Sequence, residues 1–96
     1  MVFLAPESPL DERSLSKLRW RCRRGMLEND LILERFFARH GAALTVGQAG
    51  ALNALMELSD NDLLDLHLGR RLPRQIDAAL DRFDVIEVLG LLRDKH

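Results

Sequence analysis

The chain of 96 residues contains a single cysteine, Cys22, so no disulfide can form within it. A lone thiol agrees with a reducing compartment, where disulfides are rare. The sequence also lacks any apolar run approaching the ~20 residues that span a bilayer. Its first residues show no basic segment followed by an apolar one, the pattern of a secretory signal. We therefore expect a cytoplasmic protein that does not insert into a membrane.

Residue types that support catalysis or metal binding are also sparse. The three histidines are scattered along the chain: His40, His67 and His96. One cysteine cannot supply the thiolates of a structural zinc site. The closest glycines lack the strand–turn–helix setting of a phosphate loop: Gly41, Gly47 and Gly50. No set of nucleophile and base is recognisable, so we predict no catalytic residue, no metal site and no cofactor-binding residue.

Cys22 has two possible roles. Neighbouring arginines could lower the pKa of its thiol and make it a nucleophile. However, Leu15, Leu18 and Cys22 have the spacing of one helix face. We therefore predict that Cys22 is a small apolar side chain of the core.

The chain is predicted to form one domain. Its composition, 47% hydrophobic and 30% charged, is that of a soluble globular protein with its own core but no large buried cavity. Residues 1–10, which include Pro6 and Pro9, are predicted to form a flexible N-terminal arm. Residues 11–96 are predicted to form a single helical domain.

No sustained alternation and no hairpin dipeptide indicates a sheet, so we predict an all-α bundle. The expected helices are approximately residues 11–23, 27–40, 45–58, 59–68 and 85–94. Residues 70–84 are expected to be a loop or a single helical turn. Three residue pairs have the spacing of an N-terminal cap: Thr45 with Gln48, Ser59 with Asp62, and Asp84 with Glu87. Gly41 and Gly69 are placed to end the second and fourth helices.

The first two helices carry the residues of greatest interest. Trp20 lies away from the apolar face of the first helix, so it is either covered by the N-terminal arm or offered to a partner. The second helix is apolar over most of its circumference, which is typical of a central helix. Glu28, on its narrow polar stripe, is expected to stay near the surface.

A basic cluster ends abruptly between these two helices. Its members are Lys17, Arg19, Arg21, Arg23 and Arg24. Gly25 follows, where the chain could turn with φ > 0 and where another surface could approach the main chain closely. We therefore expect Arg24 and Glu28 to flank an accessible strip of backbone.

Arginine and tryptophan on one helix occur both at nucleic-acid contacts and at protein interfaces, and composition alone does not choose between them. The net charge of −1 argues against a protein devoted to nucleic acid. Phosphate would repel Glu28, whereas a glycine flanked by opposite charges suits a protein surface. A helix–helix turn with an incidental salt bridge stays open as an alternative.

Three carboxylates crowd the fourth helix: Asp60, Asp62 and Asp65. Carboxylates at a helix N-terminus are stabilised by the helix dipole, so a solvated helix start is the expected role. Binding of a cation or a basic patch is the alternative.

The segment WRCRRGMLENDLIL, residues 20–33, closely resembles the signature of the SdhE-type succinate dehydrogenase assembly factors, whose hallmark is Arg-Gly-x-x-Glu. The segment LSDNDLL, residues 58–64, looks like the second, acidic segment of that family. Together the resemblance covers about residues 12–68, and the tail from Arg70 is only loosely comparable. It implies a small five-helix bundle.

The resemblance also implies a function. Such a chain would be an assembly factor, not an enzyme, that binds the flavoprotein subunit of succinate dehydrogenase, or of the related fumarate reductase. It would promote covalent attachment of FAD to that subunit and would hold no FAD stably itself. Carried over, the family motif assigns partner contacts to Arg24, Gly25 and Glu28, with Met26 and Asp30 beside them and Trp20 at the edge. A basic nucleic-acid-binding or regulatory module is the alternative.

Overall fold

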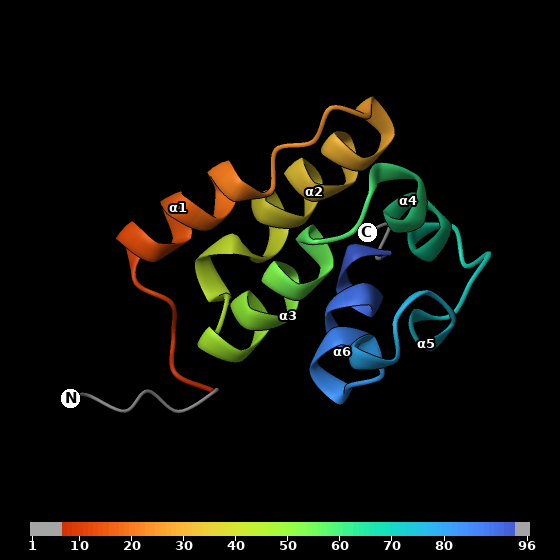
Figure 1. The fold of residues 1–96 in the computed structure, drawn as a ribbon. Coiled ribbons are helices and arrows are strands. Elements are labelled where there is room, and N and C mark those ends of the chain that lie inside the picture. Colours follow the sequence, from red (N-terminus) through yellow and green to blue (C-terminus); the bar gives the residue numbers. More distant parts are fainter. Residues whose placement is uncertain (1–6, 94–96) are drawn as a thin grey trace.

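The computed structural model describes residues 7–93, and Figure 1 shows their arrangement. The six α-helices of this part of the chain are α1 (Glu12–Arg21), α2 (Leu27–His40), α3 (Val46–Met56), α4 (Asp60–His67), α5 (Pro73–Ile76) and α6 (Phe83–Leu92). Two short 3-10 turns, η1 (Gly41–Ala43) and η2 (Ala78–Leu80), follow α2 and α5. The prediction of an all-α fold is confirmed. The five longer helices match the five expected ones, and α5 adds a single turn within residues 70–84.

The chain runs along α1, turns, and returns along α2, while α3 and α6 pack against each other beside this pair (Figure 1). The start of α2 lies against α4. The α3–α6 pairing is the most extensive contact between helices, and Leu52, Leu55, Val85 and Val88 within it are all at 0% exposure. The core therefore centres on α3 and α6.

The prediction that α2 is a central helix is only partly right. Leu33 and Phe36 are buried on its inner side. Leu27 and Leu31, however, are 63% and 53% exposed, and Ala38 is exposed on the same face. Because α4 and α6 pack against one side of α2, its other side stays open to solvent.

Two of the three predicted caps are confirmed. The Thr45 hydroxyl accepts a hydrogen bond from the Gln48 backbone N–H (3.2 Å), and the Gln48 side chain accepts one in return from the Thr45 N–H (3.0 Å). The Ser59 hydroxyl caps α4 by accepting from the Asp62 N–H (3.2 Å). Gly69 follows the end of α4 with φ 72°, as expected of a glycine stop. Gly41 also follows the last residue of α2, as predicted, but it keeps a right-handed helical conformation and begins η1.

The predicted cap of the last helix is wrong. The helix α6 begins at Phe83, so Asp84 lies inside its first turn, where its carboxylate pairs with the Arg82 guanidinium. Glu87 reaches across to α3 instead and accepts a hydrogen bond from the Gln48 amide (3.0 Å). The predicted cap therefore does not form, because Asp84 pairs with Arg82 and Glu87 pairs with Gln48 of α3. The predicted end at Asp94 lies outside the described residues.

The predicted N-terminal arm lies partly outside the described residues, which begin at Glu7. The described portion hydrogen-bonds with the start of α3. The Leu10 N–H donates to the Leu44 carbonyl and the Val46 N–H donates to the Ser8 carbonyl, each at 2.9 Å. These two bonds attach residues 8–10 to the helical domain.

His67, near the end of α4, is a buried titratable group. The residue is 8% exposed, and neither ring nitrogen has a hydrogen-bond partner in the described part of the chain. Burial, followed by the positive charges of Arg93 and Arg24, lowers the pKa of His67 to about 4. The folded protein therefore favours the neutral ring.

This shift predicts acid sensitivity. An unfolded histidine has a pKa of about 6.5, so it takes up a proton before the folded one does, and stability is lost as pH falls from about 6.5 towards 4. By pH 5 the loss is expected to be about 2 kcal/mol of the free energy of unfolding. Urea titrations at pH 7 and pH 5 measure it. In a His67→Leu variant the same pH change should have a distinctly smaller effect; an unchanged pH dependence would show that His67 is not its source.

Candidate functional site

Arg24, in the turn between α1 and α2, points its side chain into the molecule. Its Nε donates to Asp60 Oδ1 (2.8 Å), and its Nη1 and Nη2 donate to the main-chain oxygens of Met56 (3.1 Å) and Leu58 (2.6 Å). Only 12% of the side chain is exposed. Carbonyls at the C-terminal end of a helix lack intrahelical partners, and here Arg24 satisfies the one at the end of α3. One guanidinium thus joins the α1–α2 turn to the end of α3 and the start of α4.

This geometry corrects the expectation that the Arg24 side chain lies on the surface. Asp60, not Glu28, is its ionic partner. Periodicity could not reveal this pair, because its members are 36 residues apart and meet only when α4 packs against the start of α2.

Asp60 is the centre of the same cluster. Its carboxylate accepts hydrogen bonds from the Arg24 guanidinium, from the Asn29 amide (3.0 Å) and from the Met26 N–H (3.3 Å). The hydrogen bond from Arg24, followed by that from Asn29, lowers the pKa of Asp60 below its usual value. Asn29 is fully buried and also donates to the Asp60 carbonyl (2.9 Å). Asp60 therefore links α4 to the turn, and the expectation of a merely solvated carboxylate is wrong for it.

The two other acidic residues of α4 are engaged as well. Asp62 Oδ1 lies 2.8 Å from Arg71 Nη1, and Asp65 lies 3.6 Å from both Arg70 and Arg71. Within residues 7–93, no group of three or more His, Cys, Asp or Glu side chains is arranged to hold a metal ion. The basic segment after α4 thus neutralises the acidic face of that helix.

Gly25 is exposed at the tip of the turn. The positive φ that a glycine would allow is not used here, because Gly69 alone has a positive φ among the described residues. A Cβ built on Gly25 would meet only Asp60 Oδ2, at 3.9 Å, which is an ordinary van der Waals distance. Neither backbone conformation nor internal packing therefore requires glycine here.

The two carboxylates that follow this turn, Glu28 and Asp30, differ in their environment. Glu28 is exposed in the first turn of α2, as predicted, where the helix dipole stabilises its charge. Asp30 is half-buried: its Oδ1 accepts the Arg24 backbone N–H (3.0 Å) and lies 3.6 Å from Arg23 Nε. Asp30 therefore fixes the turn, while Glu28 is available to solvent. Met26, directly after Gly25, is half-buried.

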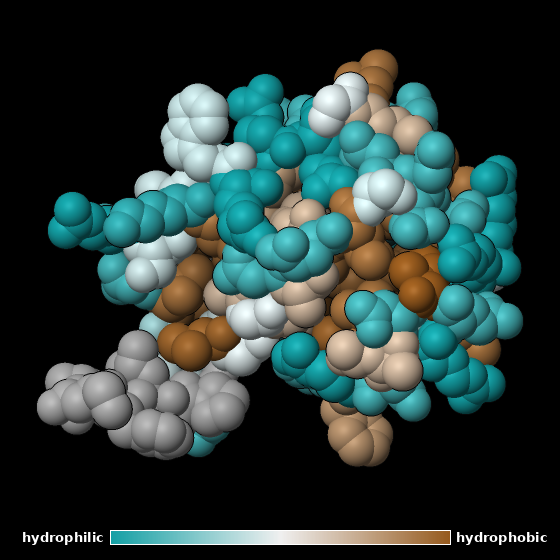
Figure 2. Space-filling view, in the orientation of Figure 1, coloured by the Kyte–Doolittle hydropathy of each residue, from teal (hydrophilic) through white to brown (hydrophobic). Residues whose placement is uncertain are grey.

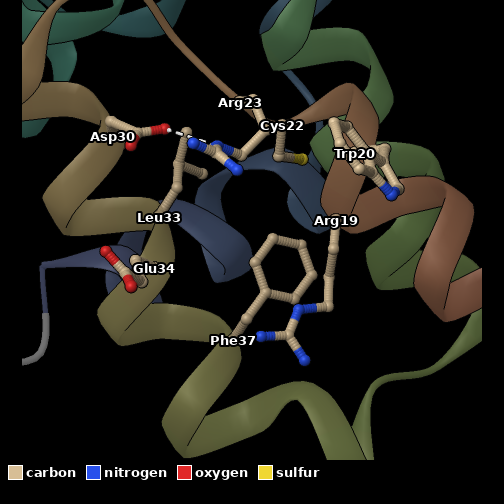
Figure 3. Close-up of a pocket in the computed structure, with 8 residues that line it drawn as sticks. All are labelled: Arg19, Trp20, Cys22, Arg23, Asp30, Leu33, Glu34 and Phe37. Carbon is tan, nitrogen blue, oxygen red and sulfur yellow. Dashed lines mark ion pairs between the residues drawn. The ribbon is translucent and has the colours of Figure 1, made fainter.

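A groove of about 350 Å³ separates α1 from α2 beside this turn (Figure 3). Buried Cys22, Leu33 and Phe37 form its floor. Trp20 lines the groove on the α1 side and is 77% exposed. Of the two alternatives predicted for it, the structure therefore favours a side chain that is open to a partner. Figure 2 shows hydrophilic side chains over much of this face, with apolar surface visible between them. Sequence reasoning missed the groove, because its two walls come from different helices.

The core role predicted for Cys22 is confirmed. The residue is 2% exposed, and burial, which outweighs the charges of Arg21 and Arg24, raises the pKa of its thiol to about 12. A thiol with such a pKa is protonated at neutral pH and is a poor nucleophile.

Three of the five cations in the basic cluster are engaged with carboxylates. Arg21 pairs with Glu57, Arg23 with Asp30 and Arg24 with Asp60. Such pairing reduces the charge available to a phosphate backbone. Among residues 7–93, no helix is long and apolar enough to cross a membrane.

The amino-acid sequence of the chain is similar to a family of known proteins. A family model described as "Flavinator of succinate dehydrogenase" matches residues 16–91. The FAD assembly factor SdhE of Ralstonia nicotianae is 52% identical over 83 residues, which are 86% of this chain and 84% of that protein. The SdhE of Legionella pneumophila strain Lens is 33% identical over 85 residues, 88% of this chain and 98% of that protein. The mitochondrial succinate dehydrogenase assembly factor 2-B of Drosophila persimilis is 37% identical over 59 residues, 62% of this chain and 38% of that protein. No solved structure matches this chain significantly.

Proposed function

Because the chain belongs to the succinate dehydrogenase flavinator family, we propose that it binds the flavoprotein subunit of that enzyme and promotes covalent attachment of FAD to it. Fumarate reductase has a related flavoprotein, which we propose as a second partner. The sequence resemblance and the family match both support this function. A nucleic-acid-binding role is not favoured, because most of the basic cluster is already paired with carboxylates.

We place the attachment chemistry in the partner and not in this chain. A factor that only binds can shift the partner towards a competent conformation by its difference in affinity for the two states. The inert thiol of Cys22 agrees with a binding role. In this proposal the chain holds no FAD of its own, and its surface acts by stabilising the flavoprotein before the bond forms.

The observation that carries this proposal is the exposed glycine at the tip of the α1–α2 turn. Gly25 is accessible, and nothing inside the molecule requires a glycine there. A residue without a side chain lets a partner approach the backbone closely. Glu28, exposed one helical turn further on, then supplies a charge that a complementary group can recognise.

The other motif residues have different parts in this proposed docking surface. Trp20 is exposed at one edge and Met26 is half-buried beside Gly25, so both are placed as contacts. Arg24 and Asp30 act from within, as positioning residues, because their polar groups hold the turn. The partner would thus contact the turn that Arg24 and Asp30 shape.

Co-expression tests the function directly. The succinate dehydrogenase flavoprotein subunit is produced with and without this chain in a host lacking its own factor, and flavin fluorescence is read on the denatured subunit. We expect bound flavin to rise with the chain and to fall again with Glu28→Ala. Glu12→Ala is the matched control, since Glu12 is also exposed in the first turn of a helix. Equal fluorescence with and without the chain would refute the proposal, and the fumarate reductase subunit tests the second partner in the same way.

A further inference from the structure

The groove between α1 and α2 has an apolar floor that is open to solvent. Leu33 and Phe37 reach it from α2, and Cys22 closes it from the end of α1 (Figure 3). Its volume of about 350 Å³ is at the low end of the ~300–1,000 Å³ range of pockets that bury drug-sized ligands. It extends over about two turns of α2, roughly 10 Å, between Asp30 and Phe37. The groove can therefore accept a large side chain together with part of the segment that carries it.

The charges on the two walls are unequal. On the α1 wall, Arg19 lies over the Phe37 ring, 5.7 Å from its centroid, and has no carboxylate partner among residues 7–93. The Arg23 side chain is 69% exposed, and its Nε lies 3.6 Å from Asp30 Oδ1, so this ion pair is solvated and weak. On the α2 wall, Asp30 accepts the Arg24 backbone N–H and faces Arg23, and the exposed Glu34 also lines the groove. The positive charge of the groove therefore lies along the α1 side, beside Trp20, and its negative charge lies along the α2 side.

The groove continues into the surface proposed for the flavoprotein. Asp30 lines the groove and at the same time accepts the backbone N–H of Arg24, immediately before Gly25. By the helical period, the exposed Leu27 and Leu31 lie on α2 between the Asp30 wall and Glu28. A partner seated on Gly25 and Glu28 can therefore reach the groove across an apolar face.

From these three observations we propose that the groove receives a large apolar side chain from an acidic segment of the flavoprotein subunit. The apolar side chain packs on Leu33 and Phe37, and Trp20 covers it from the rim. A neighbouring carboxylate of the same segment pairs with Arg19 and Arg23. Tryptophan and arginine around a desolvated centre are the composition of interface hot spots. This inference rests on the proposed function, which supplies the partner.

Calorimetric titration of the purified apo flavoprotein subunit with variants of the chain tests it. Trp20→Ala and Arg19→Glu should each raise Kd about tenfold to thirtyfold, because the first removes the ring that covers the inserted side chain and the second reverses the charge that meets the carboxylate. Arg13→Glu is the matched control: it makes the same change of charge on an exposed residue of α1 that does not line the groove, and Kd should stay within about twofold. Circular dichroism verifies that each variant is folded.

A second readout reports the groove itself. Trp20 is the sole tryptophan, so 5-fluorotryptophan gives the chain a single fluorine resonance. Its solvent isotope shift between H₂O and D₂O should be large in the free chain and should shrink when the unlabelled subunit binds.

The outcomes separate the two proposals. Suppose that Glu28→Ala weakens binding, that Trp20→Ala and Arg19→Glu leave Kd as unchanged as Arg13→Glu does, and that the isotope shift is the same in the free and the bound chain. The groove proposal is then overturned and the function stands. If Arg13→Glu weakens binding as much as Arg19→Glu, the partner is attracted by the overall positive charge of α1, and the proposal of a specific contact in the groove is overturned. If the unaltered chain does not bind the subunit, both proposals fail.

Discussion

Replacing Arg24 by alanine is expected to destabilise the folded protein by about 3 kcal/mol, because a guanidinium that makes three internal hydrogen bonds is lost. Most of this energy is assigned to the carbonyls of Met56 and Leu58, which lose a charged donor. The ion pair with Asp60 adds less, since that carboxylate is partly exposed and water screens it. For a domain of this size the loss corresponds to a melting temperature lower by about 10–20 °C.

Calorimetric or circular-dichroism melting measures the change. Glu28→Ala is the control, because Glu28 is exposed and its removal should leave the melting temperature nearly unchanged. Arg24→Lys should recover only part of the stability, since one ammonium cannot reproduce a guanidinium that donates to three acceptors in different directions. An alanine variant that melts like the parent would show that the internal hydrogen bonds of Arg24 are dispensable.

Replacing Gly25 by tryptophan is expected to abolish measurable binding to the flavoprotein subunit, at least a hundredfold in Kd, or about 3 kcal/mol. The fold should tolerate the change, because φ is not positive and the new Cβ meets one carboxylate oxygen at 3.9 Å. The indole would then project into the space that the partner backbone needs. Binding is measured by calorimetry and folding by the melting temperature.

Two glycine variants control for this result. Gly50 is exposed on α3, and a Cβ added there would meet no atom within 4 Å, so Gly50→Trp adds the same bulk away from the turn and should leave binding intact. Gly69→Ala should show the reverse pattern, a lower melting temperature with little loss of affinity in the folded fraction, because its φ is 72°. Normal affinity in Gly25→Trp would mean that close approach to this backbone plays no part in docking.

The effects of these variants differ because two kinds of residue meet in one short motif. Arg24 faces the interior and holds the turn in place, whereas Gly25 and Glu28 face solvent. Loss of function in an Arg24 variant and in a Glu28 variant would therefore have different origins. Measuring stability and affinity side by side separates them.

Local sequence patterns predicted the helices well where the signal is contained within one element. The bounds of α2, the capping box at Thr45 and the glycine stop at Gly69 all follow from a few neighbouring residues. The pattern failed at Asp84, whose expected cap gave way to a pair with Arg82 and to a contact between Glu87 and Gln48 of α3. Local propensity is a weak preference, and a partner from another helix overrides it.

By itself the sequence determined the helical class, the burial of Cys22, the exposure of Glu28 and the family to which the chain belongs. Only the tertiary structure decided the direction of the Arg24 side chain and the presence of a groove beside Trp20. Both depend on contacts between different elements, the turn with α4 in one case and α1 with α2 in the other. Helical periodicity says which face of a helix is apolar, but packing between helices decides which partner that face meets and which part of it stays open to solvent.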